Sequence, residues 1–129
     1  MTGGRPLQIG ELAERVGVSS RSLRHYEQRG LLSPERGSNG YRIYAEIDLV
    51  RAGNIKELLD TGLTTADVRQ YLDEGCLDRP LSGTVRCAAE LPTLHQRLAN
   101  LDELIDRLQR TRGTLAAHTS ALEDGVRPG

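Results

Sequence analysis

The last third of the chain carries apolar residues at steps of three and four from Leu91 to Leu122. This heptad pattern predicts one helix over residues 91–122, about 48 Å long at roughly 1.5 Å per residue. Because a single helix cannot bury its own apolar stripe, it must pack against a partner. Arg112 and Thr119 occupy stripe positions, and such polar interruptions help to select the register. The residues expected to make the dimer contacts are Leu94, Leu98, Leu101, Ile105, Leu108 and Leu115.

Two short helices are predicted near the N-terminus. Apolar residues at helical spacing favour a first helix over residues 10–16, with Gly17 as a left-handed stop. Ser19 offers its side-chain oxygen to the free amide groups of a second helix over residues 20–29, which Gly30 ends. Two helices joined by a short glycine-containing turn form a helix-turn-helix.

The second helix and the segment after it concentrate basic and aromatic side chains, including three of the four tyrosines. The Asn-Gly pair at residues 39–40, followed by a β-branched and aromatic run, predicts a hairpin. Alternation along that hairpin puts Tyr41 and Ile43 on one face and Arg42 and Tyr44 on the other. The hairpin is therefore expected to form a wing beside the helix-turn-helix.

Charge is divided unevenly along a chain whose net charge is −1. Residues 1–56 hold nine basic and six acidic residues, a balance of +3. Residues 57–129 hold eight basic and twelve acidic residues, a balance of −4. The positive half contains the helix-turn-helix, as expected of a surface that lies against phosphates. There is no apolar run of about 18 residues and no signal-peptide pattern, so we expect a cytoplasmic protein with no membrane contact.

Together these motifs resemble the MerR family of bacterial transcription regulators, closely over roughly residues 8–75 and in architecture beyond. The matching segments are Ile9-Gly10-Glu11-Leu12-Ala13, Val18-Ser19, Leu23-Arg24-His25-Tyr26-Glu27, Gly30-Leu31-Leu32, Pro34, Asn39-Gly40-Tyr41-Arg42-Ile43-Tyr44, Asp48-Leu49, Ile55 and Gly62-Leu63-Thr64. The resemblance implies a mainly α fold: a winged helix-turn-helix DNA-binding domain followed by a long antiparallel coiled-coil dimerisation helix. It further implies a homodimer on a palindromic double-stranded promoter site, where distortion of the spacer DNA serves RNA polymerase holoenzyme.

The resemblance also assigns candidate contacts to DNA. Side chains of the second helix would contact base edges or phosphates, and wing residues would contact the backbone. The candidates are Ser20, Arg21, Ser22, Arg24, His25, Tyr26, Arg36, Tyr41, Arg42 and Tyr44. The alternative for this set is that the arginines form a solvated helix face and the tyrosines fill a core that has no Phe or Trp.

Two further helices are predicted in the middle of the chain. The first spans residues 46–60 and follows Ala45, which offers no side-chain cap, so we expect a frayed first turn. Thr64 and Asp67 have the spacing of a capping box for the second, over residues 65–74. The residues of this second helix expected to be buried are Val68 and Leu72.

Cys76 and Cys87 flank the loop before the long helix. In a cytoplasmic protein we expect reduced thiols, packed as small half-buried hydrophobic side chains. Two alternatives stay open: a reversible disulfide that acts as a thiol-redox switch, or zinc held by both thiolates and His118 of the partner helix. The second thiolate pair that MerR-type metal sensors supply after this helix is missing here, and no other cofactor is expected.

The pattern divides the chain into a DNA-binding domain over residues 1–75, a connecting loop over 76–90, a dimerisation helix over 91–122 and a flexible tail over 123–129. A coiled-coil adaptor that binds protein through its winged domain is the alternative to the regulator. The heptads fit both, whereas the concentration of Arg and Tyr favours the regulator. With no nucleophile–base pair, no phosphate-cradling glycine loop and no pair of acids in a plausible cleft, an enzyme is not expected.

Overall fold

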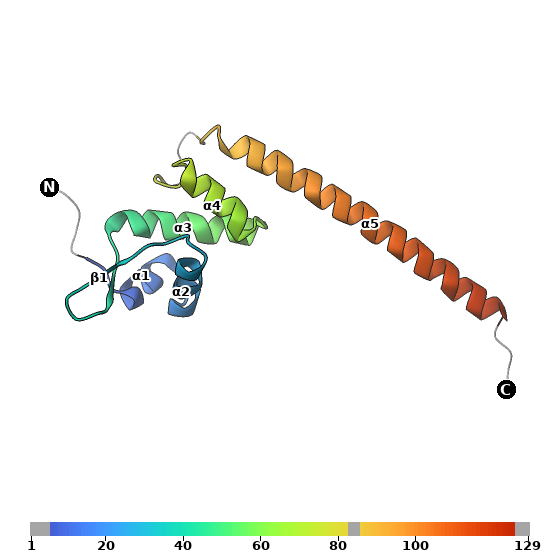
Figure 1. Cartoon of the computed structure of the whole chain (residues 1–129), viewed down its shortest axis with the longest axis horizontal. Helices are drawn as coiled ribbons and strands as arrows, with labels where there is room; N and C mark the ends of the chain where they lie inside the picture. Colours follow the sequence, from blue (N-terminus) through green and yellow to red (C-terminus); the bar gives the residue numbers. More distant parts are fainter. Residues whose placement is uncertain (1–5, 83–85, 126–129) are drawn as a thin grey trace. The chain divides into compact units, whose positions relative to one another are not determined.

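The computed structural model describes residues 6–82 and 86–125, and the chain forms two compact units, residues 1–93 and 94–129. The elements of the first unit (Figure 1) are α1 (Ile9–Val16), α2 (Ser20–Gln28), β1 (Glu35–Arg36), β2 (Arg42–Ile43), α3 (Glu46–Thr61) and α4 (Thr65–Asp73). The long helix α5 (Glu90–Gly125) starts within the first unit and makes up the second. The predicted mainly α fold, a winged helix-turn-helix followed by a long helix, is confirmed.

The helix-turn-helix is set by two local signals. Gly17 ends α1 in the left-handed conformation, with a φ of +85°, which glycine adopts without steric cost. The Ser19 side chain then accepts a hydrogen bond from the Ser22 amide at 3.0 Å and so caps α2. Leu23 of α2 is fully buried, as its position predicts. α1 packs against both α2 and α3, and this three-helix contact holds the core of the unit.

The wing is a two-stranded antiparallel sheet in which Arg36 lies opposite Arg42. Gly40, with a φ of +82°, makes the tight turn between the strands. A further bridge pairs Leu7 with Tyr44 and ties the start of the chain to the base of the wing. The hairpin predicted from the Asn-Gly signal is therefore present and anchored at its base.

α3 begins directly after Ala45, and its first turn is not frayed as expected, because Asp48 caps it. The Asp48 carboxylate, itself buried, accepts a hydrogen bond from the Ala45 amide at 2.9 Å. This is the half of a capping box that does not need a polar side chain at the cap position. The acid three residues into the helix therefore supplies the cap that Ala45 lacks.

α4 has the predicted capping box, because the Thr64 hydroxyl accepts from the Asp67 amide at 3.1 Å and the Asp67 carboxylate accepts from the Thr64 amide at 3.0 Å. Val68 is buried as predicted. The second buried residue is Tyr71 rather than Leu72, which is only half-buried. The reason lies at the start of α5, where the Tyr71 hydroxyl donates to a backbone carbonyl.

The segment after α4 packs on the first unit. The buried side chain of Asn54, from α3, donates to the carbonyls of Leu77 and Arg79 at 3.0 and 2.8 Å and accepts from the Leu81 amide at 3.2 Å. Leu77 and Leu81 are themselves buried. One asparagine thus satisfies three backbone groups and holds residues 77–81 against α3.

α5 contains 36 residues, which corresponds to about 54 Å of helix. It starts one residue before the predicted helix and continues three residues past it, and residues 126–129 of the predicted tail lie outside the described part. Five of the six predicted dimer residues are exposed along α5, and Leu94 is half-buried. The apolar stripe is therefore present and has no partner within the described chain.

Candidate nucleic-acid interface

The exposed face of α2 carries the basic residues predicted to contact DNA. Arg21, Arg24 and His25 are all exposed, while Leu23 on the opposite face is buried. Ser20 and Ser22 are half-buried at the start of the helix, where the Ser22 amide belongs to the cap. This arrangement gives α2 two cationic side chains and an imidazole that reach solvent together, the chemistry needed for phosphate and base-edge contacts.

The wing adds a second group of exposed side chains. Tyr41 is 66% exposed at the tip, and its amide donates to the Asn39 side chain at 3.1 Å. Arg36 is exposed and donates to the carbonyl of Gly40 at 3.1 Å, which holds the turn closed. Both side chains therefore extend from a wing whose tip is held by its own hydrogen bonds.

An ion pair joins the wing to α2. The Arg42 guanidinium donates from Nε to the Glu27 carboxylate at 2.5 Å, and each side chain is 25% exposed. Because the pair uses Nε, the two terminal guanidinium nitrogens are left to donate elsewhere. Arg42 thus lies at the predicted interface, with its orientation set by an acid from the helix beside it.

Two predicted contact residues belong to the core instead. Tyr26 and Tyr44 are buried, Tyr44 with 0% exposure, so neither presents a surface to DNA. Burial raises the pKa of both phenols above the ordinary value of 10.0, and the negative charge of Asp60 for Tyr26 and of Glu27 for Tyr44 raises it further. In a chain without Phe or Trp, these rings are the largest side chains available for packing, and we reassign both from contact to core.

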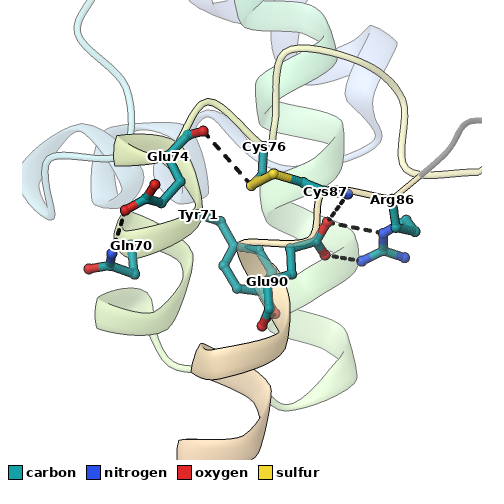
Figure 2. Close-up of a disulfide and its surroundings, with 7 residues drawn as sticks. All are labelled: Gln70, Tyr71, Glu74, Cys76, Arg86, Cys87 and Glu90. Atoms are coloured by element: carbon teal, nitrogen blue, oxygen red, sulfur yellow. Dashed lines mark hydrogen bonds and ion pairs between the residues drawn. A yellow bond between two sulfur atoms is a disulfide. The ribbon is translucent and has the colours of Figure 1, made fainter.

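The junction between α4 and α5 holds the disulfide shown in Figure 2. Cys76 and Cys87 are bonded to each other, with their Cα atoms 5.4 Å apart. The expectation of two reduced, half-buried thiols is therefore wrong: Gly75 follows α4 with a left-handed φ and turns the chain, and Cys76 is bonded to Cys87, three residues before α5 begins. Over the described ranges, no three His, Cys, Asp or Glu side chains gather as a metal site, and His118 is exposed on α5.

Glu90 is a residue of this junction whose role was not predicted from the sequence. Its side chain is 4% exposed and forms an ion pair with Arg86, and the Cys87 amide donates to the same carboxylate at 3.1 Å. The hydrogen bond to Glu90 raises the pKa of Arg86 above its ordinary value. The Tyr71 hydroxyl donates to the Glu90 carbonyl at 3.5 Å. The signal that was available is an acid three residues after Cys87, the spacing at which the carboxylate of a capping box accepts from a backbone amide.

Comparison with known proteins decides the family. The family model described as MerR HTH family regulatory protein matches residues 7–75, more than half of the chain. The chain belongs to the MerR family.

MerR-family relatives cover nearly the whole chain. The HTH-type transcriptional regulator HmrR of Rhizobium leguminosarum bv. viciae is 32% identical over 123 residues, which is 95% of this chain and 91% of that protein. The HTH-type transcriptional regulator YyaN of Bacillus subtilis is 28% identical over 92% of this chain and 94% of that protein. With these relatives the chain is assigned as a DNA-binding transcription regulator and not an enzyme.

Solved structures share the fold. HiNmlR, a MerR family regulator lacking the sensor domain and crystallised bound to promoter DNA, matches with a TM-score of 0.56 and 23% identity over 94% of this chain and 92% of that one. A putative MerR family regulator from Listeria monocytogenes matches with a TM-score of 0.54 and 25% identity over 93% and 87%. None of the helices in the described part of the chain is long and apolar enough to cross a membrane.

Proposed function

We propose that this regulator works as a homodimer on a palindromic promoter site and acts by distorting the DNA between the two half-sites. The observation that carries the proposal is that one chain presents two unpartnered surfaces of different chemistry. The basic face of α2 with the wing suits DNA, and the apolar stripe of α5 suits a second protein helix. We propose no bound cofactor for this function, and we place the protein in the cytoplasm because its DNA target is there.

A second copy of the chain is the occupant that the α5 stripe fits best. The stripe keeps heptad spacing along most of the helix and stays exposed in the single chain. An antiparallel copy brings an identical stripe with the same spacing, so the apolar positions of α5 can pack against apolar positions of the copy. Arg112, at a stripe position, disfavours uniform stacking and favours one register over others.

A two-fold symmetric dimer reads a two-fold symmetric site, with half-sites separated by whole helical turns of about 34 Å. Bending or untwisting the DNA between them has a cost that depends on base sequence, so part of the specificity would come from positions that the protein never touches. Such a change in spacer geometry is how the dimer would affect RNA polymerase holoenzyme at the same promoter.

The dimer is tested by adding one charge to the stripe. Ile105→Lys adds a positive charge at a stripe position, and Gln96→Lys adds the same charge off the stripe on the same helix. We expect light scattering to show a dimer for the wild type and for Gln96→Lys, and a monomer or unfolded chain for Ile105→Lys. A stable Ile105→Lys dimer would remove the stripe from the interface.

DNA binding is tested on a duplex that carries the region upstream of the protein's own gene. Arg24→Ala removes a charge from the exposed face of α2, while Arg110→Ala removes the same charge from α5, outside the winged unit. We expect Arg24→Ala to lower specific affinity by about 10-fold or more and to reduce the salt slope by about 1, with Arg110→Ala unchanged. Fluorescence transfer between the duplex ends reports the bend in the same complexes, and a bound duplex that stays straight would refute distortion.

A further inference from the structure

We propose that the Cys76–Cys87 disulfide is a thiol–disulfide exchange site for low-molecular-weight thiols, and that its redox state sets how firmly the first turn of α5 is held on the DNA-binding unit. This inference rests on the proposed function, because it gives the distorting dimer its means of regulation.

The disulfide closes a loop with a sequence separation of 11 between the end of α4 and the start of α5. In the chain-entropy view, closing a loop of that length shifts the balance between the folded and the opened segment by about 100-fold. Asn54 holds residues 77–81 of the loop independently, through three hydrogen bonds to the backbone. Reduction is therefore expected to release the end of the loop near α5 and to leave the end near α3 in place.

Glu90 connects the disulfide to the helix. A carboxylate with 4% exposure is buried at low cost only while its hydrogen-bond and ion-pair partners are in position. One of those partners is the amide of Cys87 and another is Arg86, the residue before it. Figure 2 shows both groups converging on the Glu90 carboxylate directly beside the sulfur–sulfur bond. When the bond opens, Cys87 and its neighbour lose their covalent tie to α4, and the buried acid loses the fixed donors that hold it.

Tyr71 of α4 makes a second contact with the first turn of α5. Its ring is 1% exposed, and its hydroxyl donates to the Glu90 carbonyl. The disulfide thus joins the residues that flank the two helices, Cys76 after α4 and Cys87 before α5, and one long hydrogen bond of 3.5 Å joins the helices themselves. The covalent bond is the stronger of the two, so its presence or absence dominates the rigidity of the turn.

The disulfide is open to small thiols. Both cysteines line a hollow of about 420 Å³, together with Arg79, Arg86 and Pro80. Cys87 is half-buried, whereas Cys76 is almost covered, so the sulfur of Cys87 is the easier one to reach. Two acids, Asp78 and Glu90, also line the hollow and balance the two arginines, so the lining does not repel the anionic thiolate, which is the attacking species in exchange.

The exchange balances without any further reactant. A small thiolate attacks the Cys87 sulfur, forms a mixed disulfide and expels the Cys76 thiolate, which takes up a proton. A second small thiolate attacks the mixed disulfide at the sulfur of the first, releasing an oxidised small-molecule disulfide and the Cys87 thiolate, which is then protonated. The protein bond gains two electrons and two protons, and two small thiols lose them. The reverse sequence, with a small-molecule disulfide as oxidant, restores the bond.

The test uses the full chain equilibrated in buffers of reduced and oxidised glutathione at a range of ratios. Alkylation and mass measurement give the fraction oxidised, amide exchange reports residues 86–93, and fluorescence transfer reports the bend of the bound operator. We expect amide exchange in this segment to rise by about tenfold or more on reduction, and the bend to decrease along the same curve. Cys76→Ser with Cys87→Ser should match the reduced protein at every ratio.

The Glu90→Gln variant tests whether Glu90 links the redox state of the disulfide to the rigidity of the first turn of α5. In this variant the disulfide should form with the same redox dependence, while amide exchange at residues 86–93 is raised at every ratio. If Glu90→Gln does not fold, the double serine variant still carries the test. Equal amide exchange and equal bending in verified oxidised and reduced protein would overturn the inference and leave the regulator intact. Absence of operator binding in both states would instead refute the proposed function, and amide exchange would still test the junction.

Discussion

Tyr44→Phe is expected to stabilise the protein, because the hydroxyl that it removes is buried without a partner. Tyr44 is fully buried, and its Oη is a buried side-chain atom for which the described residues offer no hydrogen bond. An unsatisfied buried polar group costs about 1–3 kcal/mol, and the small void left by one oxygen offsets part of that gain. We therefore expect the free energy of unfolding to rise by about 1 kcal/mol.

The measurement is urea denaturation at fixed protomer concentration, since the stability of the proposed dimer would depend on concentration. Tyr71→Phe is the matched control: the Tyr71 hydroxyl donates to the Glu90 carbonyl, so its loss should lower stability by about 0.5 kcal/mol, the low end for so long a bond. A Tyr44→Phe protein that is less stable than wild type would show that the hydroxyl has a partner. Weaker operator binding by a normally folded Tyr44→Phe would return Tyr44 to the DNA contacts.

Three further outcomes are expected. Burial, first of all, raises the pKa values of the buried tyrosines, so the folded state keeps their protons where the unfolded chain releases them. Their contribution to stability should be constant below about pH 10 and should fall above it, as measured by unfolding at increasing alkaline pH. Asp48→Ala removes the acceptor for the Ala45 amide and should lower the free energy of unfolding by about 1 kcal/mol, measured by urea denaturation; no loss would mean that water caps α3 equally well. Glu27→Ala frees Arg42 and removes a negative charge from the interface, so binding to random DNA should strengthen while the ratio of operator to random affinity falls, measured by competition at one salt concentration. An unchanged ratio would show that Glu27 does not position the wing.

Much of the helical framework could be predicted from local signals alone. Ser19 and the Thr64–Asp67 pair mark helix starts through bonds to amides within three residues, and these bonds are present. Gly17 marks a helix end through a backbone conformation that other residues avoid. The heptad spacing of the leucines along α5 can be recognised from the sequence without any knowledge of what packs against them. Each of these features depends on neighbours within one or two helical turns.

The predictions from sequence that are wrong concern residues whose role depends on partners far away in the chain. The resemblance assigns Tyr44 to the DNA contacts of the wing, but its backbone pairs with Leu7 at the base of the wing and its side chain is buried in the core. The cysteines looked like separate thiols because nothing local shows that the chain returns from residue 87 to the end of α4. In the sequence Glu90 is one of several acids near the long helix, and only the structure shows that it is buried and paired with Arg86.

The sequence by itself determined the family, the order of helices and wing, and the apolar stripe of the long helix, because caps, turns and periodicity act over short distances along the chain. Only the tertiary structure decided which tyrosines are buried, that Glu27 holds Arg42, and that Cys76, Cys87 and Glu90 form one junction. The physical reason is that burial, ion pairing and disulfide formation depend on distances in space between residues far apart in the chain, and these distances are set when α1, α3 and α4 pack together.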